Sequence, residues 1–340
     1  SAATAAEAIF AFAEAHHHLS RIIANWNREP STRALVGADY AEVVARAAEN
    51  AFMAGSADVA CALAREAIEL VDAVDHPRRS GVLHERLARY VRDTADADQA
   101  LQLVRRAVDL VPSEPPSTDR ARVLAGLAGQ LMTDGQYLEA RRLATEAVEM
   151  ARACGSVLAE SDALNTLGVL ATMIDDVELG ITLIRSAREL AEQCGDPHQQ
   201  MRSYWNAVSC LSDAGEWERA LVAFHEAEAQ LPRLGLEHLL PDLFANAADI
   251  LLRLGRWDEA QAVVDDARER FADETDVPVM SELPVERGDF DTARELIGAR
   301  LARHVFTDRE QQGWPLVHLA ALENWQGHHD AARLAVDEAL

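Results

Sequence analysis

The sequence predicts an all-α fold, a right-handed superhelix of about eight helical hairpins stacked as an α-solenoid, and three observations support this. A short motif recurs along the chain: a turn residue, an apolar residue two positions later and a small residue three positions after that. In six copies the small residue stands at positions 60, 100, 140, 180, 220 and 260, a constant step of 40. Between the motifs, apolar residues follow helical spacing, and turn-forming residues separate the hairpins.

The second helix of each hairpin begins at the motif. The clearest copies span 135–140, 215–220 and 255–260, and later copies at 288–293 and 327–332 leave the step of 40. After the turn, apolar residues recur at i, i+3, i+7, i+10 and i+14, which places them on one stripe of a helix. One such stripe consists of Trp217, Ala220, Phe224, Ala227 and Leu231.

A first helix precedes each motif, as the apolar residues Leu243, Ala247 and Ile250 indicate. The motif glycines suit the left-handed conformation that ends such a helix. Prolines at 278 and 284 interrupt one first helix, so we expect an irregular, shortened hairpin over 272–300. Because a hairpin cannot bury its apolar face alone, the hairpins must stack on one another.

We expect the hairpins to form a single repeat domain over 1–340, because no low-complexity linker divides the chain. Both ends interrupt a hairpin: 12–26 fits a second helix with no complete first helix before it, and the last hairpin stops at Leu340. Solenoids require polar capping repeats at both ends. The chain is therefore expected to be a fragment of a longer protein.

Charge and composition argue against several functions. The formal net charge is −25, and all 32 basic residues are arginine. The absence of lysine excludes Schiff-base chemistry and a phosphate loop ending in Gly-Lys-Ser/Thr. Binding to phosphate backbones needs a basic face, so we expect no direct nucleic-acid binding. We find no signal peptide and no uninterrupted apolar run of about 18 residues, so we expect a cytoplasmic protein without membrane contact.

We find no catalytic or metal-binding motif. Consecutive helical residues point about 100° apart, so His16, His17 and His18 cannot share one ion. The aspartates of 93–98 lack the glycine and the later glutamate of a calcium loop. Serine-hydrolase, zinc-protease and dinucleotide-binding motifs are absent. We therefore expect no metal, no cofactor and no enzymatic activity in this chain.

The 40-residue hairpins with Gly-x-aromatic-x-x-Ala resemble long tetratricopeptide repeats. Four stretches also resemble the helical region of large LuxR-family transcriptional regulators: Phe10–His16, Leu83–Tyr90, Ser161–Gly168 and Leu252–Ala260. In that family an ATPase module precedes the repeats and a helix-turn-helix DNA-binding domain follows them. The resemblance covers essentially the whole chain but departs from the family pattern around 272–288. It implies a sensor region that gates an ATPase switch.

This resemblance predicts a sensor or regulatory repeat domain of a bacterial LuxR-family regulator. A protein, peptide or small-molecule effector would bind the concave groove, and DNA binding would belong to another domain. The alternative is a general protein–protein interaction scaffold that takes no small-molecule ligand.

In a tetratricopeptide superhelix the first helices line the concave face, so their polar residues are the candidate binding residues. They are Asn165, Trp205, Asn206, Ser209, Asp213, Asn246, Asp249 and Arg253. The three asparagines recur at spacings of 41 and 40, which predicts neighbouring amides that hold an extended peptide. Arg89 and Arg92 lie on the corresponding face of an earlier hairpin. The alternative is that these polar residues only hydrate the inner wall or cap helices.

Overall fold

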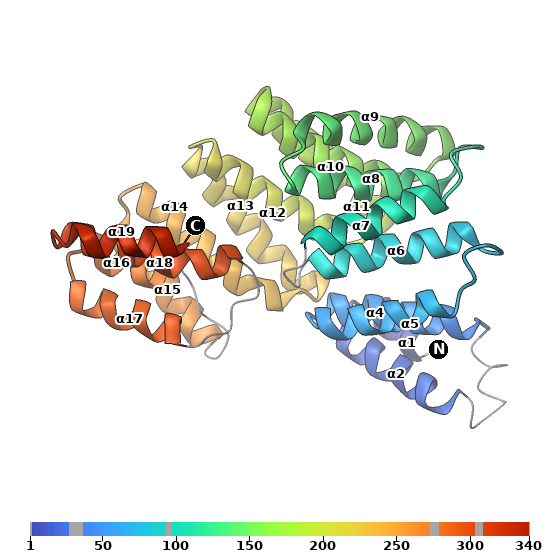
Figure 1. Cartoon of the computed structure of the whole chain (residues 1–340), viewed down its shortest axis with the longest axis horizontal. Coiled ribbons are helices and arrows are strands. Elements are labelled where there is room, and N and C mark those ends of the chain that lie inside the picture. The colour runs from blue at the N-terminus through green and yellow to red at the C-terminus, as the bar shows by residue number, and fades with distance from the viewer. Residues whose placement is uncertain (1, 27–36, 93–96, 272–278, 303–308, 340) are drawn as a thin grey trace. The chain divides into compact units, whose positions relative to one another are not determined.

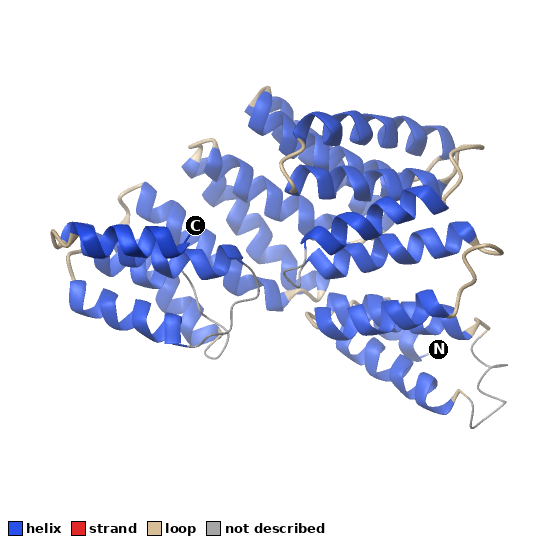
Figure 2. Ribbon diagram, viewed as in Figure 1, coloured by secondary structure: helices blue, strands red, loops and turns tan. Residues whose placement is uncertain are grey.

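The computed structural model describes residues 2–26, 37–92, 97–271, 279–302 and 309–339 (Figure 1). They form 18 α-helices and two short 3-10 helices, with no strand among these residues (Figure 2). The predicted all-α helical-repeat fold is therefore confirmed. The chain divides into two compact units, unit 1 with residues 1–214 and 226–238, and unit 2 with residues 215–225 and 239–340.

Unit 1 is a series of helical hairpins. Its helices are α1 (Ala2–Glu7), α2 (Phe12–Asn25), α4 (Tyr40–Met53), α5 (Ala57–Glu69), α6 (Pro77–Arg92), α7 (Ala97–Leu110), α8 (Thr118–Thr133), α9 (Tyr137–Cys154), α10 (Val157–Ile174), α11 (Val177–Cys194), α12 (Pro197–Asp213) and η1 (Leu231–Leu234). The first helices are α4, α6, α8, α10 and α12, and each of the first four packs against the next one in this series. The second helices α5, α7, α9 and α11 each pack between two first helices.

The small residues of the motif lie where the two helices of a hairpin approach most closely. Ala60, Ala100 and Ala140 have no exposed surface. At Gly180 even a methyl group would not fit, because its carbon would lie 2.2 Å from Cγ2 of Thr172 and 2.6 Å from the carbonyl oxygen of Gly168. The step of 40 therefore marks the tightest point of each hairpin.

Helix α10 is long and apolar enough, by length and composition, to cross a membrane. Half of this helix is buried in the structure, where it packs against α8, α9, α11 and α12. Neighbours on several sides require an apolar surface around most of a helix. Its composition is accounted for by this central place in unit 1.

Unit 2 contains α14 (Leu240–Arg253), α15 (Trp257–Arg270), α16 (Val279–Glu286), α17 (Phe290–Ala302), α18 (Arg309–Trp325), α19 (His329–Ala339) and η2 (Glu237–Leu239) at its border. Helix α13 (Trp217–Gln230) is divided between the units. Buried apolar side chains of α16, α17 and α18 form a core: Val285, Ala293, Ile297 and Leu322.

The sequence predicts a single domain over the whole chain and an irregular hairpin near its C-terminal end. The expected single domain over 1–340 differs from the observed division into two compact units. The irregular hairpin expected over 272–300 contains α16, which has only 8 residues and includes Pro284, whereas the first helices of unit 1 from α4 to α12 have 14 to 18. Residues 272–278 of that hairpin lie outside the described residues.

Candidate functional site

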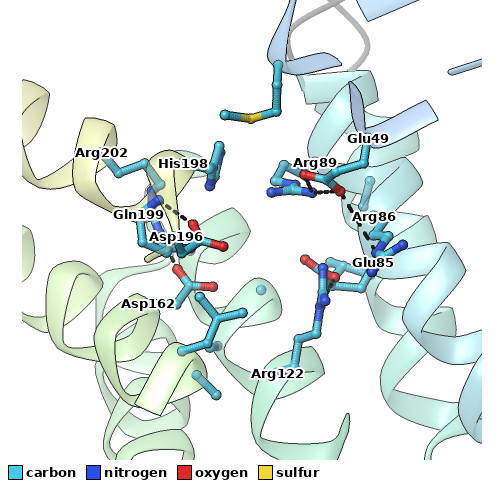
Figure 3. A pocket seen from close by; sticks show the side chains of 18 of the residues that line it. Glu49, Glu85, Arg86, Arg89, Arg122, Asp162, Asp196, His198, Gln199 and Arg202 are labelled. Atoms are coloured by element: carbon cyan, nitrogen blue, oxygen red, sulfur yellow. Dashed lines mark hydrogen bonds and ion pairs between the residues drawn. The ribbon is translucent and has the colours of Figure 1, made fainter. Parts of the chain in front are cut away.

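A cavity of about 490 Å³ lies among the first helices of unit 1 (Figure 3). We call it the pocket. Helices α4, α6, α8, α10 and α12 all contribute to its lining, with further residues from α1 and α2. Gly126 and Gly129 of α8 line it too, and a methyl group on Gly126 would lie only 3.0 Å from Cγ of Glu85. The glycines therefore leave room for long side chains from the neighbouring helices.

Glu49 of α4 is the centre of an ion-pair network on one wall. Its carboxylate accepts hydrogen bonds from Nη2 of Arg89 at 2.6 and 2.7 Å and from the hydroxyl of Tyr90 at 2.8 Å. Burial would raise the pKa of Glu49, but the charges of Arg89, Arg86 and Arg122 outweigh this effect and lower the pKa to about 2. Glu49 is therefore a carboxylate anion at neutral pH.

Two further ion pairs join neighbouring first helices at the pocket. Nε of Arg122 on α8 donates to the buried carboxylate of Glu85 on α6 at 2.6 Å. Arg202 of α12 pairs with Asp162 of α10. These pairs tie consecutive hairpins together around the pocket, whose walls combine ion pairs with apolar side chains such as Met53 and Val104.

His198 and Asp196 lie on the wall opposite Arg89 (Figure 3). His198 is only 5% exposed, and its ring centroid lies 5.9 Å from that of Phe52 on α4. Burial, together with the charges of Arg89, Arg202, Arg92 and Arg122, lowers the pKa of His198 well below its usual value. The imidazole is therefore neutral. Asp196 caps α12 by accepting from the backbone amide of Gln199 at 2.8 Å, and burial raises the pKa of its carboxyl.

None of the eight residues predicted from the sequence lines the pocket. Asn165 is fully buried: its amide donates to the hydroxyl of Ser203 at 2.8 Å and accepts from Nδ2 of Asn206 at 2.5 Å. Asn165 and Asn206 are thus neighbours, as the repeat spacing predicts, but Asn165 has no surface to offer a ligand. Its assignment as a groove residue needs correction, because its hydrogen-bonding groups are used inside unit 1.

The other predicted residues lie on half-buried or exposed surface. Trp205, Asn206, Ser209, Asn246 and Asp249 are half-buried, and Asp213 and Arg253 are exposed. Arg253 lies 3.2 Å from Asp249 within α14 and 3.7 Å from Glu282 of α16. Asn246, Asp249 and Arg253 belong to unit 2, whereas the other five predicted residues belong to unit 1.

The pocket carries a sequence signal that the amide-based prediction did not use. The partners Glu49 and Arg89, and likewise Asp162 and Arg202, are 40 residues apart, which is the repeat step itself. An acid in one first helix followed one repeat later by an arginine predicts an ion pair between hairpins. Arg89 was noted on the correct face, but without its partner.

The histidines and aspartates considered for metal binding have other surroundings. Nδ1 of His16 is 2.9 Å from the carbonyl oxygen of Ala47, so this half-buried ring joins α2 to α4. No three His, Cys, Asp or Glu side chains in the described ranges are grouped to hold an ion. Asp93 and Asp96 lie outside those ranges.

Comparisons with known proteins identify the fold. No family model matches the chain, and no curated protein matches it. A Rap protein solved in complex with competence and sporulation factor is similar, with a TM-score of 0.62 and 14% identity over 99% of this chain and 94% of that one. The Rap conjugation gene regulator of plasmid pLS20, solved with the Phr* peptide, has a TM-score of 0.53 and 14% identity over 77% and 72%.

A third similar structure corrects the expectation that the chain is not an enzyme. It is aspartyl phosphate phosphatase F from Bacillus subtilis, with a TM-score of 0.55 and 13% identity over 100% of this chain and 94% of that one. A protein of this fold is thus named as a phosphatase, so neither an all-helical repeat fold nor missing motifs of other enzyme classes exclude catalysis. The identities show the fold alone. The chain has a tetratricopeptide-like helical-repeat fold similar to that of the Rap proteins.

Proposed function

We propose that this chain is a regulatory repeat domain whose pocket in unit 1 binds a peptide effector. The pocket carries this proposal: at about 490 Å³ it has the volume of an ordinary ligand site, roughly 300–1,000 Å³. Its charged lining also favours binding, since a buried ion pair is often no more stabilising than well-packed apolar side chains of the same volume. A set of charges around a cavity is therefore better explained by a ligand than by stability.

The choice of a peptide is supported by the fold. Two similar structures were solved with a bound factor or peptide, the competence and sporulation factor in one and the Phr* peptide in the other. Their identities to this chain are too low to transfer a binding site. The pocket of unit 1 supplies the site, and the similar structures supply the class of ligand.

A ligand in the pocket has a direct route to a regulatory effect. The pairs Glu49–Arg89, Glu85–Arg122 and Asp162–Arg202 each join two consecutive hairpins. A bound group that competes for one of these arginines changes the interaction that sets the spacing of two hairpins. A ligand shifts a conformational equilibrium by its difference in affinity for the two states.

The finer proposal is that this domain is the cytoplasmic sensor region of a LuxR-family regulator. Its support is the resemblance of the four stretches named above, which include Leu83–Tyr90 beside the pocket. Sequencing the coding DNA on both sides tests it: a phosphate-loop ATPase module upstream and a helix-turn-helix domain downstream are expected. An open reading frame that closes without either module contradicts this part of the proposal.

A docking scaffold is the second candidate, and exposed apolar residues favour it. Val59, Leu138 and Leu179 are 44%, 77% and 48% exposed at the first turns of α5, α9 and α11, the second helices of unit 1. A partner protein that used these residues would not need the pocket. The following experiment separates the two candidates.

Peptides are selected from a random heptapeptide library on the immobilised protein, and their dissociation constants are measured by calorimetry. The neutralised pair Glu49→Gln with Arg89→Gln is compared with a matched pair in unit 2, Asp249→Asn with Arg253→Gln. We expect at least tenfold weaker binding, about 1.4 kcal/mol, for the first variant only. If no peptide is enriched, or if the unit 2 variant alone weakens binding, the pocket is not the peptide site.

A further inference from the structure

The pocket contains more hydrogen-bond donors than its own acceptors can use. Each guanidinium has five N–H groups. Within the described residues, Arg86 donates no hydrogen bond; its closest ion-pair contact is from Nε to Oε2 of Glu49 at 3.9 Å. Arg89 donates only through Nη2, its Nε being buried and unpaired, and Arg122 donates only through Nε.

The carboxylates on this side of the pocket are already engaged. Glu49 accepts from Arg89 and Tyr90, and Glu85 accepts from Arg122. We call Arg86, Arg89 and Arg122 the arginine trio. Three guanidiniums share two carboxylates in this group of five side chains.

His198 faces the trio across the pocket and adds an unused polar group (Figure 3). It makes no hydrogen bond to any described residue, and its Nδ1 is buried without a partner. Asp162 and Asp196 lie on the His198 side, and Asp162 is bound by Arg202. The carboxylate of Asp162 is therefore used by Arg202. That of Asp196 accepts from the backbone amide of Gln199 and also interacts with the charges of Arg89 and Arg122.

We propose that the pocket binds an anionic oxygen-acid group of its ligand, a carboxylate or a phosphate, between the arginine trio and His198. Guanidinium groups bind both anions through paired, charge-assisted hydrogen bonds. The neutral imidazole supplies one further N–H donor. Burial is the main cause that lowers the pKa of His198, and the arginine charges that add to this effect also attract the anion. This inference rests on the proposed function, because it specifies which part of an effector the pocket recognises.

The test uses three small probes at constant ionic strength: inorganic phosphate, triglycine and triglycine amide. Triglycine and its amide differ at the C-terminus, where only triglycine carries a carboxylate. Binding is measured by calorimetry and by the rise of the melting temperature, since a ligand that binds only the folded state stabilises it. We expect saturable binding of phosphate or of triglycine, and at least tenfold weaker binding of the amide.

Variants locate the anion. Arg86→Gln removes a guanidinium that makes no hydrogen bond to the described residues, so it is expected to fold; we expect at least tenfold weaker binding of phosphate or triglycine. Arg185→Gln, an exposed arginine of α11 outside the pocket, serves as the matched control and leaves binding unchanged. The double variant Glu85→Gln with Arg122→Gln removes an ion pair together and provides a second test should Arg86→Gln be unfolded.

The outcomes distinguish a phosphate ligand from a carboxylate ligand. They also distinguish failure of the anion site from failure of peptide binding. Phosphate alone indicates a phosphorylated ligand, triglycine alone indicates a free carboxylate, and either supports the anion site. Measurable binding of triglycine and its amide with equal affinity overturns the anion site while peptide binding to the pocket stands. An unchanged affinity of the Arg86→Gln variant for phosphate or triglycine does the same. If selected peptides still require Glu49 and Arg89 but none of the three probes binds, the anion site alone fails. If neither the three probes nor any selected peptide binds, both proposals fail.

Discussion

Ion pairs are arranged differently in the two units. In unit 1, Arg89 reaches Glu49 and Arg202 reaches Asp162, each across one repeat of 40 residues, and the four side chains are between 13% and 30% exposed. Substituting one residue of such a pair therefore affects two hairpins. The pairs therefore hold the hairpins around the pocket.

In unit 2, many ion pairs lie within one helix and on its surface. Arg256 with Glu259 and Arg270 with Asp266 are separated by three and four residues. The pair Arg287–Asp258 joins two helices, but its aspartate is fully exposed. Exposed pairs contribute little to stability because water screens them. Arginines and acidic residues thus surround a pocket in unit 1, whereas in unit 2 they form mainly exposed surface pairs.

The largest effect is expected from removing one partner of the central pair. Arg89→Ala leaves the carboxylate of Glu49 in a partly buried site without its main partner, so we expect a loss of about 3–5 kcal/mol in the free energy of unfolding. The double variant Glu49→Gln with Arg89→Gln should lose much less, because neither charge remains. Urea denaturation measures both. Equal losses would mean that the pair is not the source of the effect.

The next comparison is between a glycine at a tight helix crossing in unit 1 and a glycine at an open helix position in unit 2. Gly180→Ala in unit 1 forces a methyl group against Thr172 and Gly168, so we expect a loss of about 1–3 kcal/mol in unfolding free energy. Gly298→Ala in α17 of unit 2 meets no atom within 4 Å and should instead gain about 0.5–1 kcal/mol from helix propensity. Thermal denaturation shows opposite shifts if the packing is as described; shifts of the same sign would contradict it.

Two buried histidines predict a dependence of stability on pH. Burial is the main cause that lowers the pKa of His198 in unit 1, and it lowers that of His318 in unit 2 to about 4. The unfolded chain binds protons near pH 6.5, before the folded protein does, so stability is present above pH 6.5 and falls as the pH drops towards 4. His198→Gln and His318→Gln should each reduce this fall in urea denaturation. A fall as large in both variants would exclude the histidines as its source.

The smallest effect is expected on the surface of unit 2. Arg256 and Glu259 form a fully exposed pair three residues apart. Arg256→Gln should leave the urea midpoint unchanged within experimental error, because solvent screens the pair. A clear decrease in the urea midpoint would show that burial does not explain the difference between the ion pairs of the two units.

The fold could be predicted because its signals are local. The motif glycines predict the end of each first helix, and Gly135, for example, has a φ of +76°. The small residues predict the close crossing within a hairpin, and Ala140 is fully buried there. These features depend on residues a few positions apart, so sequence periodicity is sufficient to place them.

The candidate site depends on which first-helix residues are covered, and periodicity does not determine this. The repeat spacing correctly made Asn165 and Asn206 neighbours, yet it gave no information on depth, and Asn165 is buried. The pocket needs residues from five first helices to converge. The spacing of 40 between Glu49 and Arg89, and between Asp162 and Arg202, is the sequence signal of this convergence.

A cross-linking measurement tests most directly that the ion-paired pocket of unit 1 is the ligand site. A selected peptide that carries a benzophenone group is irradiated on the protein, and the cross-linked residues are identified by mass spectrometry. We predict cross-links to pocket residues of α4, α6, α8 and α12, with Met53 among them because it lines the pocket. Their loss in the Glu49→Gln with Arg89→Gln variant is also expected. Cross-links confined to α9 and α11 around Leu138 and Leu179, or to unit 2, would contradict the account.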